Sequence, residues 1–308
     1  MRLGVLDVGS NTVHLLVVDA YPGARPWPAH SEKSVLRLAE QITPDGRLSD
    51  EGAEALIEAV NDARRSAERL QTEDLLAFAT SAVRDATNCA EVLARVRQET
   101  GVELRVLSAE GEARMTFLAV RRWFGWSAGR LLVIDIGGGS LELAAGVDEE
   151  PDVALSVPLG AGRLTRDRLH GDPPRTAEVV ALIEYAEKTL EKPAKALRSS
   201  SWDRPVCTSK TFRSLARLAG AAPSGAGPLV PRLLTRTGLH QVLGFIRRIP
   251  SGSLAGMDGV SASRAHQLLA GAVVAEATMN MLDIDALELC PWALREGVIL
   301  RRLDILES

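Results

Sequence analysis

The chain contains few cysteines and no excess of basic charge. Its three cysteines, Cys89, Cys207 and Cys290, are scattered and show no C-x-x-C spacing, which argues against a disulfide framework and against a zinc site. The 36 Lys and Arg residues are outnumbered by 40 Asp and Glu, giving a net charge of −4. This balance does not favour nucleic-acid binding. We expect free thiols in a reducing cytoplasm, and a local cluster of cations wherever an anionic substrate binds.

Long hydrophobic runs and targeting patterns are also missing. No apolar run reaches the roughly 18 residues that a membrane span needs, and the chain starts directly with a strand pattern and no signal-peptide pattern. Apolar residues make up 46% and charged residues 25%, the profile of a soluble globular protein. We therefore expect a cytoplasmic protein without a membrane partner, and 308 residues are enough for two domains.

One strand-turn-strand pattern occurs twice. The stretch "LDVGSNTVHLLVVD" begins at Leu6 and "LLVIDIGGGSLELAAG" begins at Leu131. When the two are aligned, Asp7 matches Asp135, Gly9 matches Gly137, Thr12 matches Ser140 and His14 matches Glu142. Each copy opens one half of the chain, which indicates duplication at the scale of a domain.

Hydrophobic patterning supports two halves with a similar plan. The first half predicts strands at 2–8 and 12–19 with a third within 30–40, followed by helices at 49–70 and 89–99. A strand that runs into a loop at 75–88 and a strand-loop-helix unit at 102–120 complete it. The second half predicts strands around the glycine turn at 131–146 and a further strand near 153. It continues with a helix at 175–197, strand-turn-helix at 204–220, a Pro/Gly-rich loop at 221–231, and mainly helices from 235 to 307 with a break at 250–262. We expect domains at 1–125 and 126–292, with a helix at 293–308 as a candidate completion of the first.

A glycine turn after a buried strand is suited to phosphate. Without a Cβ the backbone comes close to a ligand, and successive N–H groups can point at one anion. An aspartate at the end of each strand can hold Mg²⁺, which takes few protein carboxylates and completes its shell with substrate oxygens. Two such turns predict a site that grips a phosphate chain, in the cleft between two domains.

Five motifs in order resemble a known family. The duplicated Asp-x-Gly turns are similar to those of the actin, hexokinase and Hsp70 superfamily. Together "DVGSNT", "ATSAVRDATN", "SAEGEARMTFLAV", "DIGGGSLEL" and "PWALREGVIL" resemble the exopolyphosphatase and guanosine pentaphosphate phosphatase family over nearly the whole chain. The resemblance implies an α/β fold of two ribonuclease H-like (actin-like ATPase) domains related by internal duplication, with the active site in the interdomain cleft. Within the family, the chain resembles the short members, which lack the extra C-terminal helical domain.

The same resemblance implies roles for acidic residues. Glu112 would be the general base, with Glu110 as the competing choice. Asp135 and Glu142 would hold Mg²⁺ or the lytic water, and Asp7 would be a metal ligand at the first turn. Since His14 stands where the second copy has Glu142, we interpret His14 as a packed core histidine and assign catalysis mainly to the second turn.

The substrate's phosphates need donors and cations. Arg84 can clamp a phosphate with two hydrogen bonds, while we interpret Asn88 as a helix cap. In "CTSKT", Lys210 replaces a glycine of the family's G-x-S-G-T loop. The Lys210 ammonium is either solvated or placed at the site, where it would suit a polyanion. In the second case the side chain can also block the binding of a nucleotide base. The expected phosphate-binding residues are Ser10, Asn11, Thr12, Arg84, Gly137, Gly138, Gly139, Ser140, Ser209, Lys210 and Thr211. Candidates to line a polyphosphate channel are Lys33, Arg37, Arg163, Arg166, Arg213 and Arg264.

The resemblance implies a Mg²⁺-dependent exopolyphosphatase that releases terminal orthophosphate from inorganic polyphosphate. Mn²⁺ is an alternative metal, K⁺ a further cation, and a homodimer the expected assembly. Hydrolysis of guanosine pentaphosphate (pppGpp), which would connect the chain to the stringent response, is the closest alternative. An ATP-dependent small-molecule kinase and a noncatalytic nucleotide sensor or actin-like polymer are more distant ones.

Overall fold

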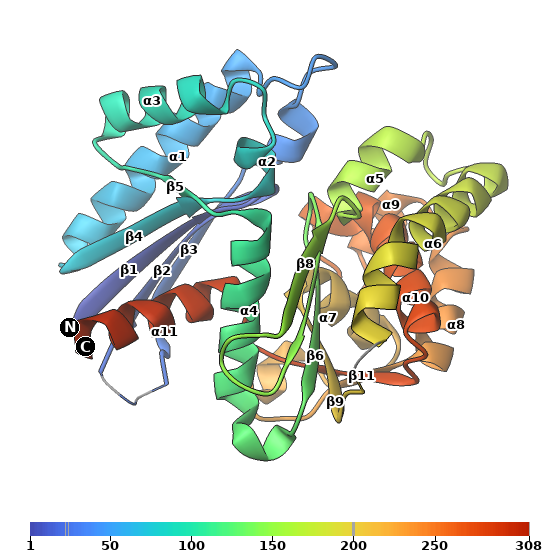
Figure 1. The fold of residues 1–308 in the computed structure, drawn as a ribbon. Helices are drawn as coiled ribbons and strands as arrows, with labels where there is room; N and C mark the ends of the chain where they lie inside the picture. The colour runs from blue at the N-terminus through green and yellow to red at the C-terminus, as the bar shows by residue number, and fades with distance from the viewer. Residues whose placement is uncertain (22, 24, 199–200, 308) are drawn as a thin grey trace. The chain divides into compact units, whose positions relative to one another are not determined.

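The chain folds into two units, each built on one mixed sheet (Figure 1). The computed structural model describes residues 1–307 except 22, 24, 199 and 200. Unit 1 comprises Met1–Met115 and Leu294–Ser308, and unit 2 comprises Thr116–Ala293. The division falls inside helix α4 (Ala109–Phe124), whereas the domain ranges expected from the sequence place it just after this helix.

Unit 1 has a five-stranded sheet of order β3-β2-β1-β4-β5. Neighbours β1 to β3 are antiparallel, while β4 and β5 run parallel to β1. Both faces are covered: Leu6 and Val8 of β1 pack with α1, and Leu3 and Val5 pack with α11. This alternation explains why β1 reads as a continuous apolar run. The elements are β1 (Arg2–Val8), β2 (Thr12–Asp19), β3 (Pro28–Val35), η1 (Leu38–Gln41), α1 (Asp50–Arg69), β4 (Asp74–Ala79), α2 (Ser81–Arg84), α3 (Cys89–Thr100), β5 (Arg105–Val106) and α11 (Leu294–Glu307).

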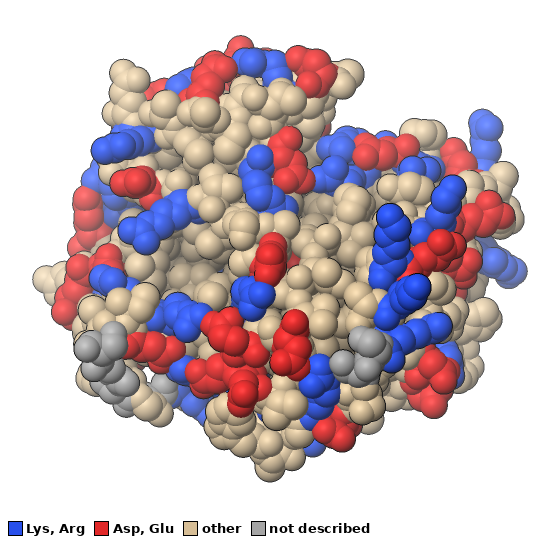
Figure 2. All heavy atoms as spheres, viewed as in Figure 1, with Lys and Arg blue, Asp and Glu red and all other residues tan. Residues whose placement is uncertain are grey.

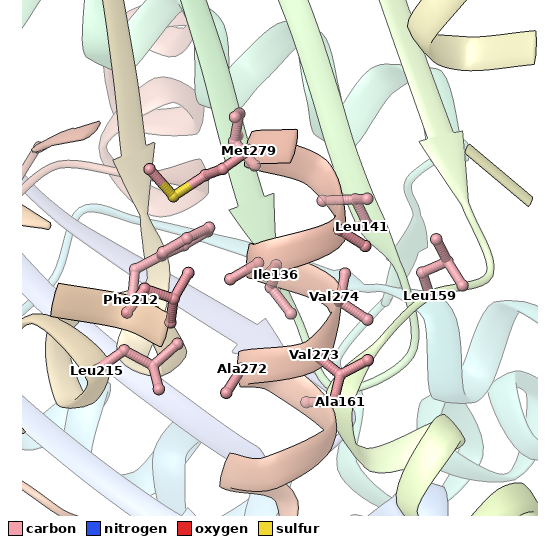
Figure 3. Close-up of a cluster of buried hydrophobic side chains, with 14 of the residues drawn as sticks. Ile136, Leu141, Leu159, Ala161, Phe212, Leu215, Ala272, Val273, Val274 and Met279 are labelled. Atoms are coloured by element: carbon pink, nitrogen blue, oxygen red, sulfur yellow. The ribbon is translucent and has the colours of Figure 1, made fainter. Parts of the chain in front are cut away.

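Unit 2 has a six-stranded sheet of order β10-β11-β9-β6-β7-β8. Its core surrounds α10, and Figure 3 shows Ile136 and Leu141, the residues on either side of the glycine turn, lying against this helix. Phe212 of α7 is part of the same core. The glycine turn thus rests on a hydrophobic base. The elements are η2 (Trp126–Ala128), β6 (Leu131–Ile136), β7 (Leu141–Gly146), β8 (Val153–Val157), α5 (Ala161–Arg168), α6 (Thr176–Arg198), β9 (Arg204–Thr208), α7 (Ser209–Leu218), η3 (Ser224–Ala226), β10 (Leu233–Thr235), α8 (Arg236–Ile246), α9 (Ser251–Ala255), η4 (Ala262–Gln267), α10 (Leu268–Met281) and β11 (Ala286–Leu289).

The two sheets repeat one topology, which confirms the internal duplication and the ribonuclease H-like fold class. Order β3-β2-β1-β4-β5 is matched by β8-β7-β6-β9-β11, with the same parallel and antiparallel neighbours. Asp7 faces His14 across β1–β2, as Asp135 faces Glu142 across β6–β7. Each turn is closed by the same bond: Gly9 N donates to Thr12 O at 3.0 Å, and Gly137 N donates to Ser140 O at 2.9 Å.

The third strand begins at Pro28 and ends at Val35, where a 3-10 helix follows, so it covers only the first part of the expected 30–40 stretch. The region from 235 to 307 is mainly helical, as expected, but two short strands were not predicted: β10, which ends at Thr235, and β11 at Ala286–Leu289. Strands β10 and β11 are short and are stabilised by pairing with their neighbours in the sheet. They are therefore too short to show an alternating hydrophobic pattern in the sequence.

Charges of both signs are interspersed on the face drawn in Figure 2, in keeping with the small net charge. None of the helices in the described part of the chain combines the length and hydrophobicity that a bilayer crossing requires. All three cysteines carry free thiols.

Candidate active site

In unit 1, three parallel strands end at one edge of the sheet. Because β1, β4 and β5 run parallel, the residues that follow them meet there. Ser10, after β1, bonds through its hydroxyl to the Ser81 hydroxyl, after β4, at 2.8 Å. Leu107, after β5, donates its N–H to Ala79 O at 3.0 Å, and α4 with Glu112 begins directly beyond. The topology thus brings the first glycine turn, the "TSAVR" segment and the start of α4 to one edge.

Arg84 forms an ion pair with Glu112. Both are largely shielded from solvent, with side chains 17% and 9% exposed. Arg84 also donates to Leu107 O at 3.2 Å and to Asp85 at 3.1 Å. Burial lowers the pKa of the Arg84 guanidinium, but attraction and hydrogen bonds to Glu112 and Asp85 outweigh it and leave the pKa raised. A fixed cation therefore orients the Glu112 carboxylate.

The competing acid, Glu110, has different surroundings. Its side chain is 58% exposed and accepts two bonds from Arg114, one turn along the same helix, at 3.0 and 2.6 Å. This is an ordinary i,i+4 pair on a helix surface. Burial therefore distinguishes Glu112 from Glu110.

The C-terminal helix of unit 1 reaches the first turn. Arg295 of α11 donates to Asp7 Oδ2 at 3.1 Å, a contact between the two ends of the sequence. Gly297 packs so tightly on α4 that a Cβ there would overlap the backbone of Met115. The motif "PWALREGVIL" thus supports both Asp7 and the helix of Glu112. Neither contact could be predicted from the sequence.

The remaining first-turn residues are mostly buried. Ser10 and Asn11 are 6% and 4% exposed, whereas Thr12 is partly exposed. His14 is 4% exposed and bonds through Nε2 to Ser31 at 2.8 Å, so it is a buried, hydrogen-bonded histidine, as expected. Burial, followed by the charges of Arg295 and Lys33, lowers the pKa of His14 to about 3.

In unit 2, two carboxylates face each other beside the second turn. Asp135 and Glu142 are direct cross-strand partners, so their side chains lie on one face of the sheet. Glu142 is 6% exposed and accepts a bond from Ser156 at 3.0 Å. Within the described residues no group of three or more His, Cys, Asp or Glu gathers around one point. A pair of carboxylates next to phosphate donors nevertheless fits Mg²⁺, which draws most of its ligands from water and substrate.

The second turn is held by residues 160–163, of which only Arg163 was expected near the substrate, as a candidate channel residue. Ala161 N donates to Gly137 O at 3.0 Å, and Arg163 N donates to Gly138 O at 2.9 Å. The Arg163 side chain donates to Gly139 O at 2.9 Å. A Cβ at Gly160 would overlap the backbone of Gly139 and Ser140. Three carbonyls of the turn are thereby occupied, which fixes its backbone for anion binding.

The "CTSKT" segment also supports this turn. Thr211 donates its hydroxyl to Ile136 O at 3.1 Å, and Thr208 donates to Trp292 O at 3.0 Å. Ser209 has φ of 94°, a conformation that is costly for a residue with a Cβ. Thr208-Ser209 repeats Thr80-Ser81 at the same 128-residue offset as the two turns, a signal that could have been read from the sequence. Lys210 is partly exposed, and Ala82 occupies the matching place in unit 1.

Several other candidates have partners within their own unit. Arg37 pairs with Glu40 at 3.7 Å and Arg166 with Asp167 at 2.6 Å, while Arg213 donates to Pro291 O at 2.8 Å. The interpretation of Asn88 as a helix cap was wrong in its mechanism. Asn88 precedes α3, but its amide exchanges two bonds with the backbone of Leu48, at 2.9 and 3.0 Å, and its side chain makes no cap bond.

A repeated ribonuclease H-like fold, with a glycine turn in each copy and a carboxylate pair beside the second, defines a protein of the actin-like class. The model of the Ppx/GppA phosphatase family matches residues 16–305, and the chain belongs to that family. It is 58% identical over 305 residues to "Exopolyphosphatase 1" of Mycobacterium tuberculosis H37Rv, covering 99% of this chain and 89% of that protein.

More distant relatives include both named activities. "Guanosine-5'-triphosphate,3'-diphosphate pyrophosphatase" of Aeromonas hydrophila is 27% identical over 96% of this chain and 58% of its own length. Among solved structures, an exopolyphosphatase from Cytophaga hutchinsonii has a TM-score of 0.89 at 25% identity, covering 99% of this chain and 98% of that one. The Ppx/GppA family member of Aquifex aeolicus has a TM-score of 0.81 at 26% identity, covering 100% and 99%.

Proposed function

We propose that this chain is an exopolyphosphatase that releases orthophosphate from the end of inorganic polyphosphate. The observation that carries the proposal is its 58% identity, across 99% of its length, to proteins named Exopolyphosphatase 1. The two glycine turns support it, because they offer backbone donors suited to a polyanion. The Arg84–Glu112 pair supports a hydrolytic role, since it holds a buried carboxylate in one orientation.

The reaction is a displacement at the terminal phosphorus. A water oxygen forms the new P–O bond, and the anhydride P–O bond to the next phosphate breaks. The products are orthophosphate and a polyphosphate chain that is one unit shorter. Glu112 accepts the proton of the attacking water as general base. Arg84 holds the Glu112 carboxylate in place and donates to phosphate oxygens with its remaining N–H groups.

Mg²⁺ is the proposed metal, with Mn²⁺ as an alternative, and Asp135 and Glu142 would hold it. When bound, the ion neutralises charge on the phosphate oxygens. The metal role predicted for Asp7 stays a prediction, and its contact with Arg295 is the interaction with which a metal ion would compete.

Phosphate oxygens would be bound by the two turns and the start of α7. The proposed ligands are donors of Ser10, Asn11, Thr12, Gly137, Gly138, Gly139 and Ser140, with the hydroxyl of Ser209 and the Lys210 ammonium. Thr211 belongs to this set mainly as support, because its hydroxyl already donates to Ile136 O.

Hydrolysis of guanosine pentaphosphate is the second candidate. The similarity to the Aeromonas enzyme, which covers 96% of this chain and 58% of that protein, favours it. Both substrates end in the same phosphoanhydride group. A preference for polyphosphate or for guanosine pentaphosphate must therefore come from residues that contact the rest of the substrate.

A phosphate-release panel tests the proposal. Purified protein is incubated with tripolyphosphate, long-chain polyphosphate, guanosine pentaphosphate or ATP, with Mg²⁺ or with EDTA. We expect phosphate release from both polyphosphates with Mg²⁺, and no release with EDTA. Much faster cleavage of guanosine pentaphosphate would overturn the assignment, and transfer from ATP to an acceptor without release would indicate a kinase. The predicted homodimer rests on the family resemblance alone and is checked by light scattering. The cytoplasmic location stays a prediction from the sequence.

A further inference from the structure

We propose that Ser156 is a positioning residue, which holds the Glu142 carboxylate in the orientation that binds the divalent metal ion. Ser156 lies on β8 and is not among the site candidates that the sequence indicated. The inference rests on the proposed function, because it deepens the role given there to Glu142. All of its contacts lie within unit 2.

The contact between Ser156 and Glu142 follows from the register of the strands. The two residues are direct partners across the antiparallel pair β7–β8, so their side chains stand on one face of the sheet. The Ser156 hydroxyl donates to Glu142 Oε1 at 3.0 Å. On the other side of Glu142, its direct partner across β6–β7 is Asp135. Glu142 therefore stands between the second carboxylate and the serine hydroxyl, in one row across three strands.

The two carboxylate oxygens of Glu142 have different surroundings. Oε1 accepts the bond from Ser156, whereas Oε2 lies toward the glycine turn, where a Cβ added to Gly137 would be 3.9 Å from it. A glutamate side chain has several rotatable bonds, and a hydrogen bond to one oxygen fixes the direction of the other. Hydrogen bonds of this kind orient the carboxylates that hold metal ions. Ser156 thus directs Oε2 toward the turn that is expected to bind phosphate.

The strand itself does not require a hydroxyl at this position. The other residues of β8, in the sequence "VALSV", are apolar, and strand pairing uses backbone groups only. Among the described residues, Glu142 is the one side-chain partner of the Ser156 hydroxyl. The hydroxyl therefore serves the carboxylate and not the packing of the sheet.

Unit 1 contains a serine in a corresponding place. Ser31 lies on β3, the strand that matches β8, and bonds His14 at 2.8 Å. His14 is the residue that faces Asp7 across β1–β2. In both units a serine of the outer strand thus contacts the side chain that faces the aspartate. Only in unit 2 is that side chain a carboxylate, so only there can the serine support a metal ligand.

The test uses Mn²⁺ alone as the probe, titrated into metal-free protein and followed by the electron paramagnetic resonance signal of free Mn²⁺. Ser156→Ala should raise the dissociation constant for Mn²⁺ by about 10-fold or more, because a metal ligand loses the partner that orients it. Ser156→Thr keeps a hydroxyl and should restore most of the affinity. Ser34→Ala is the matched control. Ser34 is a half-buried serine on β3, without a side-chain hydrogen bond among the described residues, and its variant should bind Mn²⁺ like wild type.

Phosphate release from polyphosphate supplies a second measurement. The Mg²⁺ concentration that gives half-maximal release should rise in Ser156→Ala by a factor similar to that for Mn²⁺ binding. Excess Mg²⁺ should recover most of kcat, because the variant keeps both carboxylates and Glu112. A loss of kcat that excess Mg²⁺ does not recover, combined with unchanged Mn²⁺ affinity, would overturn the inference.

A purely structural role for Ser156 predicts a different pattern. Ser156→Ala would then melt at a lower temperature in EDTA while binding Mn²⁺ as tightly as wild type, and this result would reject the positioning role. A wild-type enzyme that releases phosphate but binds no Mn²⁺ would reject it as well, and would leave the exopolyphosphatase assignment intact. If wild type binds Mn²⁺ but releases no phosphate, the proposed function fails, and the Mn²⁺ titration of Ser156→Ala still decides the positioning role.

Discussion

Arg84 and Glu112 form a buried ion pair although 28 positions separate them in the sequence. Their elements follow neighbouring parallel strands, β4 and β5, so the sheet brings them together. Removing one partner of a buried pair leaves an uncompensated charge, which costs far more than an exposed pair contributes. Glu112 is thus held by a shielded cation, whereas Glu110 is 58% exposed and pairs with Arg114 on the helix surface.

Arg84→Gln should lower kcat strongly, by about 100-fold or more, because both the orientation of Glu112 and a phosphate contact are lost. Arg84→Lys should recover little, since an ammonium cannot bond Glu112, Asp85 and Leu107 O in the same planar arrangement. Steady-state phosphate release measures both variants. Circular dichroism checks their folding, and an active Arg84→Gln enzyme would show that the pair does not serve catalysis.

Gly160→Ala should destabilise the protein by about 2 kcal/mol or more and reduce phosphate binding, because the added methyl overlaps the backbone of Gly139 and Ser140. Gly244→Ala in α8 is the matched control. Nothing lies within 4 Å of a Cβ at that position, and better helix propensity should stabilise it by about 0.5 kcal/mol. Urea unfolding compares the two, and equal stabilities would contradict the described packing around the turn.

Acid should destabilise unit 1 through His14. Burial, with the charges of Arg295 and Lys33, lowers its pKa from 6.5 to about 3. Between these values the unfolded chain binds a proton and the folded chain does not, so stability falls as the pH drops through this window. From pH 6.5 to 4 the loss is about 3 kcal/mol.

The measurement is urea unfolding across this range for wild type and His14→Gln. The stability difference between them should shrink by about that amount toward pH 4, because the variant has no imidazole to protonate. His240→Gln, at a histidine whose side chain is 79% exposed, controls for the loss of a histidine as such. Parallel curves for wild type and His14→Gln would contradict the prediction.

The duplicated turns were readable because each depends on residues close in sequence: an apolar strand, a small-residue turn and a second strand. The contacts that organise the site were not readable in this way. Asp7 meets Arg295 only because α11 packs against β1, and the Asn88 side chain bonds the backbone of Leu48 instead of capping α3. Gly160 looks like an ordinary loop glycine until the fold places it against Gly139. The repeated Thr-Ser pair was visible in the sequence, yet only the matching strands β4 and β9 show that it marks equivalent places.

The central claim, a hydrolase whose general base is Glu112, is tested most directly by a matched pair of variants assayed with polyphosphate. Glu112→Gln keeps the size of the side chain and removes its basicity, so turnover should fall by at least about 100-fold while the chain still binds polyphosphate. Glu110→Gln, two residues away on the exposed side of α4, should stay within about twofold of wild type. An active Glu112→Gln beside an inactive Glu110→Gln would contradict the account.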